Sequence, residues 1–245
     1  MKGIILAGGL GTRLYPLTWA TNKHLLPVFD QPMIFYPINT LLKAGVKEIL
    51  VVTGGPHAGH FLQVLKNGKE LGLKHLEYAY QEGEGGIAAA LSLAEDFADG
   101  GAVAVVLGDN TTDADISPAV KNFQEGATVF LKKVPDPERF GVPVFSKKDP
   151  KKIIKIEEKP AKPQSSFAVT GLYLYDNEVF KIIKTLKPSA RGELEITDVN
   201  NGYLEQGKLN WFELEGFWSD AGTFESLFRT NQYWAKKKMS KAKLP

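Results

Sequence analysis

The chain has 245 residues, 43% of them hydrophobic, which suffices for one large α/β domain or two small ones with a sizeable core. The formal net charge is +2, but five of the 30 basic residues are lysines at 236 and beyond, so the remainder holds 25 basic against 28 acidic residues and lacks the basic surface expected of a nucleic-acid-binding protein. The absence of cysteine excludes disulfides, thiolate zinc sites and cysteine nucleophiles. Without a signal-peptide pattern or an apolar run of membrane-spanning length, the sequence predicts a cytoplasmic protein with no membrane partner.

Strand-like and helix-like patterns alternate through the first half of the chain. The expected strands are 3–7, 48–53, 76–81 and 103–107, and the expected helices are 33–43, 57–66 and 87–98. This alternation predicts a Rossmann-like three-layer α/β/α sandwich around a mostly parallel, mixed sheet. Ligands of such sheets bind beyond the carboxyl ends of the strands, so one site is expected to draw on the loops at Gly8, Gly54, Gln81 and Gly108.

The second half has a different character, because frequent prolines interrupt short strand patterns such as 152–156 and 168–175. We expect a smaller β-rich portion that continues or covers the first sheet, followed by a helix near 223–236. The whole chain, 1–245, is therefore predicted to be a single domain. Residues 1–134 and 135–235 would be two halves around a shared cleft, and 236–245 a basic tail that is disordered and solvated.

The loop after the first strand is rich in glycine, with Gly8, Gly9 and Gly11 leaving bare amides that a ligand could touch. Thr12 can add a hydrogen bond, and Arg13 and Lys23 supply fixed positive charge, a combination that suits phosphates. The spacing fits neither a Walker loop nor the dinucleotide fingerprint of NAD-dependent oxidoreductases, which would need a glycine at position 14. From the glycines alone, a tight turn beneath the sheet edge is an equally good interpretation.

Two aspartates are candidates for a metal site. Asp109 follows a very apolar strand, and Asp220 lies far along the chain between aromatic and glycine residues. If the two carboxylates meet, they could hold Mg²⁺, which prefers oxygen ligands. The alternative is that Asp109 is a helix cap or turn residue. Asp113 and Asp115 are expected to be solvated loop acids.

Polar groups elsewhere suggest a base and a sugar. The Gln81 amide offers a donor and an acceptor that could read a pyrimidine edge, and Gly86 leaves room for a backbone contact. Glu158 could accept hydrogen bonds from hexose hydroxyls, while Lys159 and Arg191 could neutralise a phosphate. A polar strand end, a solvated surface and, for Arg191, a hold on the helix expected near Glu193 are the structural alternatives. A metal role for His57 and His60 is not expected.

The string from Leu6 to Thr18, which reads LAGGLGTRLYPLT, resembles the signature of the sugar-phosphate nucleotidylyltransferases, in particular the thymidylyltransferases. The match continues through NKHLLP from Asn22. Further matching strings follow in family order at 107–110, 136–141, 157–160, 168–171 and 191–198, and the resemblance extends to Asp220. Because it covers nearly the whole chain, it raises the functional interpretations above the structural alternatives.

The resemblance implies a magnesium-dependent transfer from dTTP to α-D-glucose 1-phosphate, which gives dTDP-glucose and pyrophosphate and opens the dTDP-L-rhamnose and deoxysugar pathways. It implies catalytic roles for Arg13 and Lys23 and a Mg²⁺ site on Asp109 and Asp220. The implied nucleotide-binding residues are Leu6, Gly8, Gly9, Gly11, Thr12, Arg13, His24, Gln81, Gly86 and Asp109. The implied sugar-phosphate-binding residues are Asn110, Gly141, Glu158, Lys159, Val169 and Arg191. A homo-oligomer, dimer or tetramer, is usual in the family.

Two alternatives remain open: the same chemistry with UTP, another triphosphate or another sugar 1-phosphate, and an inactive regulatory protein that senses nucleotide sugars. Residues 87–90 read IAAA, where a polar residue is expected in relatives, which bears on base selectivity. Many thymidylyltransferases continue past the last helix through a segment that helps form a second, regulatory nucleotide site. Feedback inhibition is therefore expected to be absent or different here.

Overall fold

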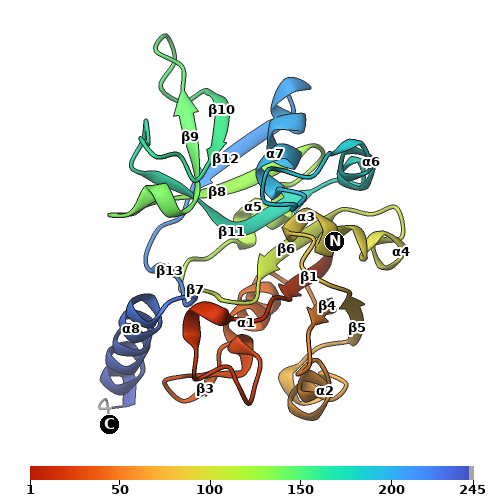
Figure 1. The fold of residues 1–245 in the computed structure, drawn as a ribbon, viewed down its shortest axis with the longest axis vertical. Helices are drawn as coiled ribbons and strands as arrows, with labels where there is room; N and C mark the ends of the chain where they lie inside the picture. Colours follow the sequence, from red (N-terminus) through yellow and green to blue (C-terminus); the bar gives the residue numbers. More distant parts are fainter. Residues whose placement is uncertain (243–245) are drawn as a thin grey trace.

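A computed structural model describes residues 1–242, and a nine-stranded sheet runs through this part of the chain (Figure 1). Its parallel portion has the order β6 (Val103–Leu107), β1 (Lys2–Ala7), β4 (Glu48–Gly54) and β5 (His75–Gln81). The strand order changes direction on either side of β1, which is where sheets of this kind open a crevice for a ligand. The four strands lie within a residue of their predicted positions.

The second half extends the same sheet. β11 (Phe167–Tyr175) lies antiparallel beside β6, with Leu172 opposite Val106. It also pairs with β8 (Ala127–Lys133) and β9 (Gly141–Phe145), and beyond them lie β10 (Ile153–Glu158) and β12 (Leu209–Glu213). The β-rich portion therefore continues the first sheet, and the predicted mixed α/β architecture is confirmed.

Helices cover both faces of the sheet because its strands are apolar on both sides. Ile4 and Leu6 face α3 (Ile87–Ser92), α4 (Glu95–Ala98), α6 (Glu178–Thr185) and α7 (Ile196–Glu205) in one core cluster. Ile5 and Ala7 point the other way, toward α1 (Phe35–Lys43), α2 (Gly59–Leu65) and α5 (Ser117–Asn122). The helix expected over 87–98 is thus two short helices. Within residues 1–242, none of the helices combines the length and apolar character that a membrane crossing would need.

A small ribbon joins the two halves at the edge of the sheet. β7 (Asn110–Thr112) pairs antiparallel with β13 (Trp218–Asp220), so that Asp220 lies opposite Asn110. The amide of Ala221 also donates to the carbonyl of Asp109, at 2.9 Å. These backbone contacts bring together two aspartates that are 111 positions apart in the sequence. The remaining short elements are β2 (Pro27–Val28), β3 (Gln31–Pro32) and 3-10 helices at Thr12–Leu14, Lys23–Leu25, Lys69–Leu71 and Pro137–Arg139.

The last helix, α8 (Phe224–Ala242), is longer than predicted. Leu227 and Trp234 pack against Leu14, Met33 and Tyr36 in a third core cluster beside β13. The expectation of a disordered tail is wrong for residues 236–242, which continue the helix, while residues 243–245 lie outside the described part.

Ion pairs on α8 explain the extra length. Lys238 pairs with Asp30, and Lys237 and Tyr233 both bond Asp113. Asp113 also accepts the amide of Phe217 at 2.7 Å, so the interpretation of this residue as a solvated loop acid is wrong. Partners that are distant in the sequence hold it. Asp115 lies on the surface and accepts the Ser117 amide.

Candidate active site

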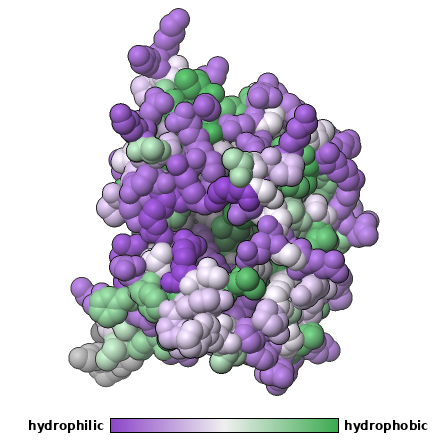
Figure 2. Space-filling view, viewed as in Figure 1, coloured by the Kyte–Doolittle hydropathy of each residue, from purple (hydrophilic) through white to green (hydrophobic). Residues whose placement is uncertain are grey.

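Two adjoining cavities open at the carboxyl edge of the parallel strands. Figure 2 shows the hollow in the middle of this face, rimmed largely by hydrophilic residues. The first cavity has a volume of about 300 Å³ and reaches from the glycine loop to Gln81. The second, of about 160 Å³, lies toward β9, β10 and β11. Both are lined by Arg13, Asp109 and Glu193, so the cavities meet at these residues.

The glycines of the first loop are explained by close approaches. A side chain at Gly8 would begin 2.8 Å from Oε1 of Gln81, and Gly9 adopts a φ of +90°. Gly8 and Gly9 line the first cavity with Leu6. Gly11 and Thr12 are not among its lining residues; Gly11, with a φ of +67°, begins the 3-10 helix that contains Thr12. These two residues shape the loop behind the cavity, and their predicted nucleotide contacts stay predictions.

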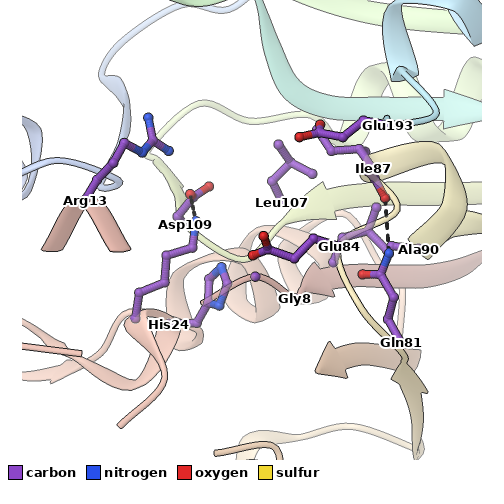
Figure 3. Close-up of a pocket in the computed structure, with 14 residues that line it drawn as sticks. Gly8, Arg13, His24, Gln81, Glu84, Ile87, Ala90, Leu107, Asp109 and Glu193 are labelled. Atoms are coloured by element: carbon purple, nitrogen blue, oxygen red, sulfur yellow. Dashed lines mark hydrogen bonds and ion pairs between the residues drawn. The ribbon is translucent and has the colours of Figure 1, made fainter. Parts of the chain in front are cut away.

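Lys23 and Asp109 form a largely buried ion pair, with Nζ of Lys23 2.6 Å from Oδ2 of Asp109 (Figure 3). Burial alone would raise the pKa of Asp109, but the Lys23 ammonium holds that pKa well below its usual range. Asn110 donates to the other carboxylate oxygen, Oδ1, at 3.0 Å. The side-chain oxygen Oδ1 of Asn110 in turn accepts from the Gly171 amide and the Trp218 indole. Asn110 therefore lines the second cavity while tying Asp109 to β11 and β13.

Asp220 and Asp109 converge on one point. A Cβ at Gly222 would lie 3.2 Å from Nη2 of Arg13, 3.3 Å from Oδ2 of Asp220 and 3.4 Å from Oδ2 of Asp109. Burial, and then the charge of Asp109, raise the pKa of Asp220. Two like charges held this close favour a cation between them.

The donor set at Gly222 fits a hard divalent ion. Residues 1–242 contain no cluster of three or more histidine, cysteine or acidic side chains that could hold a metal. Mg²⁺ does not need one, because it is commonly bound by one or two carboxylates and completes its shell with waters and phosphate oxygens. Gly222 leaves open space beside these two carboxylate oxygens and the Arg13 guanidinium, where the two aspartates could supply such ligands.

His24 is almost wholly buried beside Gly108, at the wall of the first cavity. Only 2% of the residue is exposed, and Nδ1 lies 2.7 Å from Oδ1 of Asn22. A side chain at Gly108 would begin 2.7 Å from Cδ2 of the His24 ring. Burial, and then the charge of Lys23, lower the pKa of His24 to about 3, so the ring is neutral at pH 7. It borders the first cavity, and its predicted nucleotide contact stays a prediction.

Gln81 stands at the far end of the first cavity from Arg13 (Figure 3). Its amide nitrogen donates to the carbonyl of Gly86 at 3.3 Å, which fixes the plane of the amide. Gly86 has a φ of +90°, and a side chain there would begin 2.7 Å from the Leu194 carbonyl oxygen, so only glycine fits. Glu84, which was not predicted as a site residue, accepts the Leu10 amide at 3.3 Å and also lines the cavity.

The second cavity gathers the predicted sugar-phosphate residues. It is lined by Asn110, Gly141, Glu158, Lys159, Val169 and Arg191. Glu158 accepts a hydrogen bond from Oγ1 of Thr197 at 2.5 Å. Lys159 holds its backbone at a φ of +44°, a left-handed conformation that a residue with a side chain rarely adopts.

Arg191 is surrounded by carboxylates. Its Nη2 lies 2.8 Å from Glu195, 3.6 Å from Glu193 and 3.5 Å from Glu158. Glu195 precedes the first residue of α7 and also accepts from Ser189. The structural interpretation of Arg191, a hold on the start of this helix, thus agrees with its contacts, and Arg191 lines the second cavity as well.

Several residues around these cavities were not predicted individually: Glu84, Arg139, Glu193, Glu195 and Thr197. Arg139 donates to both Asp136 and Asp220. All but Glu84 lie inside the strings that carry the family resemblance, 136–141 and 191–198, and that position was the available signal. Their partners could not be read from it, because those depend on contacts between distant segments.

Comparisons with known proteins agree with this arrangement. The family model described as nucleotidyl transferase matches residues 2–237. A glucose-1-phosphate thymidylyltransferase of Actinoplanes sp. is 46% identical over 238 residues, covering 95% of this chain and 78% of the relative. One from Neisseria gonorrhoeae is 48% identical over 235 residues, with coverages of 93% and 80%.

Solved structures show the same relationship. A Bacillus anthracis protein assigned as a glucose-1-phosphate thymidylyltransferase superposes with a TM-score of 0.90 at 52% identity, covering 95% of this chain and 94% of its own. A UDP-glucose pyrophosphorylase in complex with UDP-glucose has a TM-score of 0.85 at 23% identity, covers 96% and 98%, and shows the shared fold. With a family model matched over nearly its full length and relatives of this similarity, the chain belongs to the nucleotidyl transferase family.

Proposed function

We propose that this nucleotidyltransferase transfers a thymidylyl group from dTTP to α-D-glucose 1-phosphate and releases pyrophosphate. Support comes from the names of the relatives that are 42–48% identical over most of the chain. The observation that carries the proposal is the meeting of Arg13, Lys23, Asp109 and Asp220 at the junction of two cavities. One cavity suits a nucleotide and the other a sugar phosphate, so the reacting groups would meet where the charges are concentrated.

The reaction needs little activation of its nucleophile. The second ionisation of a phosphate monoester has a pKa near 6, so glucose 1-phosphate is already a dianion at neutral pH. One of its phosphate oxygens would attack the α-phosphorus of dTTP in line. A new P–O bond forms as the bond between the α-phosphorus and the α–β bridging oxygen breaks, and pyrophosphate leaves. Such transfers depend on positioning and charge stabilisation rather than on a general base.

The cationic side chains would do most of this work. Arg13, which borders both cavities, would hold the departing pyrophosphate, and Lys23, which pairs with Asp109, would neutralise charge at the reacting phosphate. Asp109 and Asp220 would hold Mg²⁺, which neutralises phosphate charge when bound. Loss of the positive charge of Arg13 or of Lys23 is expected to cost about 3 kcal/mol of transition-state stabilisation, by analogy with the donors of an oxyanion hole. Lys23→Ala and Arg13→Ala should therefore fold but lose most of their turnover.

The experiment is pyrophosphate release with Mg²⁺ from dTTP, UTP, CTP, ATP and GTP, each tested against glucose, galactose, mannose and N-acetylglucosamine 1-phosphates. Release confined to dTTP, or to dTTP and UTP, with glucose 1-phosphate is the expected result. A preference for UTP or for another sugar would revise the specificity and keep the reaction. No release across the panel from folded protein would overturn the proposal and favour a regulatory nucleotide-sugar-binding protein.

The proposal carries two further expectations of the family. The protein would work in the cytoplasm, where nucleoside triphosphates are available, and it would form a homo-oligomer, either a dimer or a tetramer. Light scattering of the purified protein at assay concentrations would give the oligomeric state; a monomer that turns over at full rate would remove the second expectation.

A further inference from the structure

We propose that Arg139 is a positioning residue for the metal site, which orients the carboxylate of Asp220 toward the cation. Arg139 lies in the 3-10 helix Pro137–Arg139, just before β9, and so belongs to the half of the chain that carries the second cavity. Asp220 lies on β13 and, like Arg139, lines the second cavity. The inference rests on the proposed metal-dependent transfer, and it assigns to Arg139 a role that acts through Asp220.

The guanidinium of Arg139 is held between two carboxylates. Nη2 donates to Oδ2 of Asp220 at 2.8 Å, and Nη1 donates to Oδ2 of Asp136 at 2.7 Å. The group also stacks near the Phe140 ring, 5.1 Å from its centroid. Arg139 is 27% exposed at the side chain and Asp220 is 12% exposed, so neither swings freely in solvent.

Within residues 1–242, the Asp220 carboxylate accepts a hydrogen bond from Arg139 and from no other residue. The oxygen concerned, Oδ2, is also the one that faces the point at Gly222 where Asp109 and Arg13 converge. A carboxylate oxygen has two lone pairs, so it can accept from Arg139 and still bind a cation. Arg139 thus fixes the direction of the lone pair that remains.

The Asp109 carboxylate has two hydrogen-bond partners, whereas that of Asp220 has Arg139 alone among residues 1–242, so the orientation of Asp220 depends more strongly on its partner. Lys23 and Asn110 both bond Asp109, one at each oxygen, and Asn110 is anchored in turn to β11 and β13. Asp220 is bonded instead by Arg139, whose guanidinium also donates to Asp136. Hydrogen-bond partners of metal ligands typically contribute 10-fold to 100-fold to metal affinity because they set the orientation of the ligand. The planar fork of arginine suits a bridge between two carboxylates, and a lysine ammonium cannot reproduce it fully.

The test measures metal binding apart from turnover. Mn²⁺ is titrated into wild type, Arg139→Gln, Arg139→Lys and Asp136→Asn, and the free ion is followed by electron paramagnetic resonance without substrates. We expect Arg139→Gln to bind Mn²⁺ 10-fold to 100-fold more weakly, with smaller losses in Arg139→Lys and Asp136→Asn. Arg229→Gln, on the exposed face of α8, is the matched control and should bind as wild type does.

Turnover gives a second readout. In Arg139→Gln the Mg²⁺ concentration for half-maximal pyrophosphate release should rise, and excess Mg²⁺ should restore most of kcat, which a general loss of structure would not allow. Unchanged or tighter Mn²⁺ binding in a folded Arg139→Gln would overturn the proposal. If that variant does not fold, unchanged binding in Asp136→Asn would do so. Because binding is read without substrates, a wild type that binds Mn²⁺ but is silent in the assay would contradict the proposed function alone.

Discussion

Replacing Gly222 by alanine places one methyl group at the centre of the site. The backbone of Gly222 lies outside the left-handed region, so alanine can adopt it without strain. The new Cβ would lie 3.2–3.4 Å from Nη2 of Arg13, Oδ2 of Asp220 and Oδ2 of Asp109, closer than most carbon–oxygen contacts. Mg²⁺ binds oxygens at about 2.0–2.1 Å and keeps waters, so the methyl group competes directly with its shell.

The expected consequence is a loss of catalysis without a loss of fold. A reacting oxygen displaced by about 1 Å typically costs roughly 10²-fold in rate, and we expect kcat/KM of Gly222→Ala to fall by about that factor. The free energy of unfolding should fall by about 1–3 kcal/mol, because three neighbouring polar groups crowd the added methyl group, and the fold should be kept. Pyrophosphate release at several Mg²⁺ concentrations and denaturant unfolding measure the two quantities.

Gly59→Ala is the matched control. Gly59 is exposed at the first position of α2, and a Cβ there has no neighbour within 4 Å. This variant should gain up to about 1 kcal/mol of stability from helix propensity and keep its turnover. Normal turnover and normal Mg²⁺ dependence in Gly222→Ala would refute the placement of the cation between Asp109 and Asp220.

Three further predictions test separate parts of the account. Glycine adopts the left-handed backbone of Lys159 without strain, so Lys159→Gly should raise the free energy of unfolding by about 1 kcal/mol. Loss of the ammonium group should raise the KM for glucose 1-phosphate about tenfold. An unchanged KM would show that Lys159 does not contact the sugar phosphate. Burial would raise the pKa of Asp113, but hydrogen bonds from Lys237 and Tyr233 lower it overall. Wild type should therefore be more stable than Asp113→Asn at pH 7 and lose that advantage as the pH falls below about 4. An equal difference in the free energy of unfolding at pH 7 and at pH 3 would contradict this. Burial lowers the pKa of His24 to about 3, so below about pH 6.5 the unfolded state binds a proton that the folded state does not. Below pH 6 the free energy of unfolding of wild type should therefore fall by about 1.4 kcal/mol per pH unit more than that of His24→Gln. Parallel curves for the two proteins would refute a neutral buried ring.

The sequence was sufficient for the parallel strands and the edge on which they open. β1, β4 and β6 are short apolar runs, whereas β5 at the edge of the parallel portion mixes apolar, aromatic and polar residues. Glycine or glutamine marks the point where each strand ends. The rule that ligands bind at the carboxyl ends then brought Gly8, Gln81 and Asp109 to one site. The structure has all three lining the first cavity.

The parts that could not be predicted depend on contacts between distant segments. The helical state of residues 236–242 reflects Lys237 and Lys238 bonding acids more than 100 positions away. For the same reason Asp113 has a structural partner rather than water, and Arg139 reaches Asp220. A run of lysines, or an acid in a loop, gives no local sign of such a partner. In the glycine loop, Gly11 and Thr12 are close in sequence to the cavity yet lie behind it, because the chain turns into a 3-10 helix there.

The fate of phosphorus labels tests the central claim most directly. Wild-type protein is incubated with Mg²⁺, glucose 1-phosphate and dTTP that carries ³²P at either the α or the γ position, and the products are separated. We expect the α label in dTDP-glucose and the γ label in pyrophosphate, in equal amounts. Transfer of the γ label to the sugar phosphate, or loss of the γ label as inorganic phosphate with no nucleotide sugar formed, would contradict attack at the α-phosphorus.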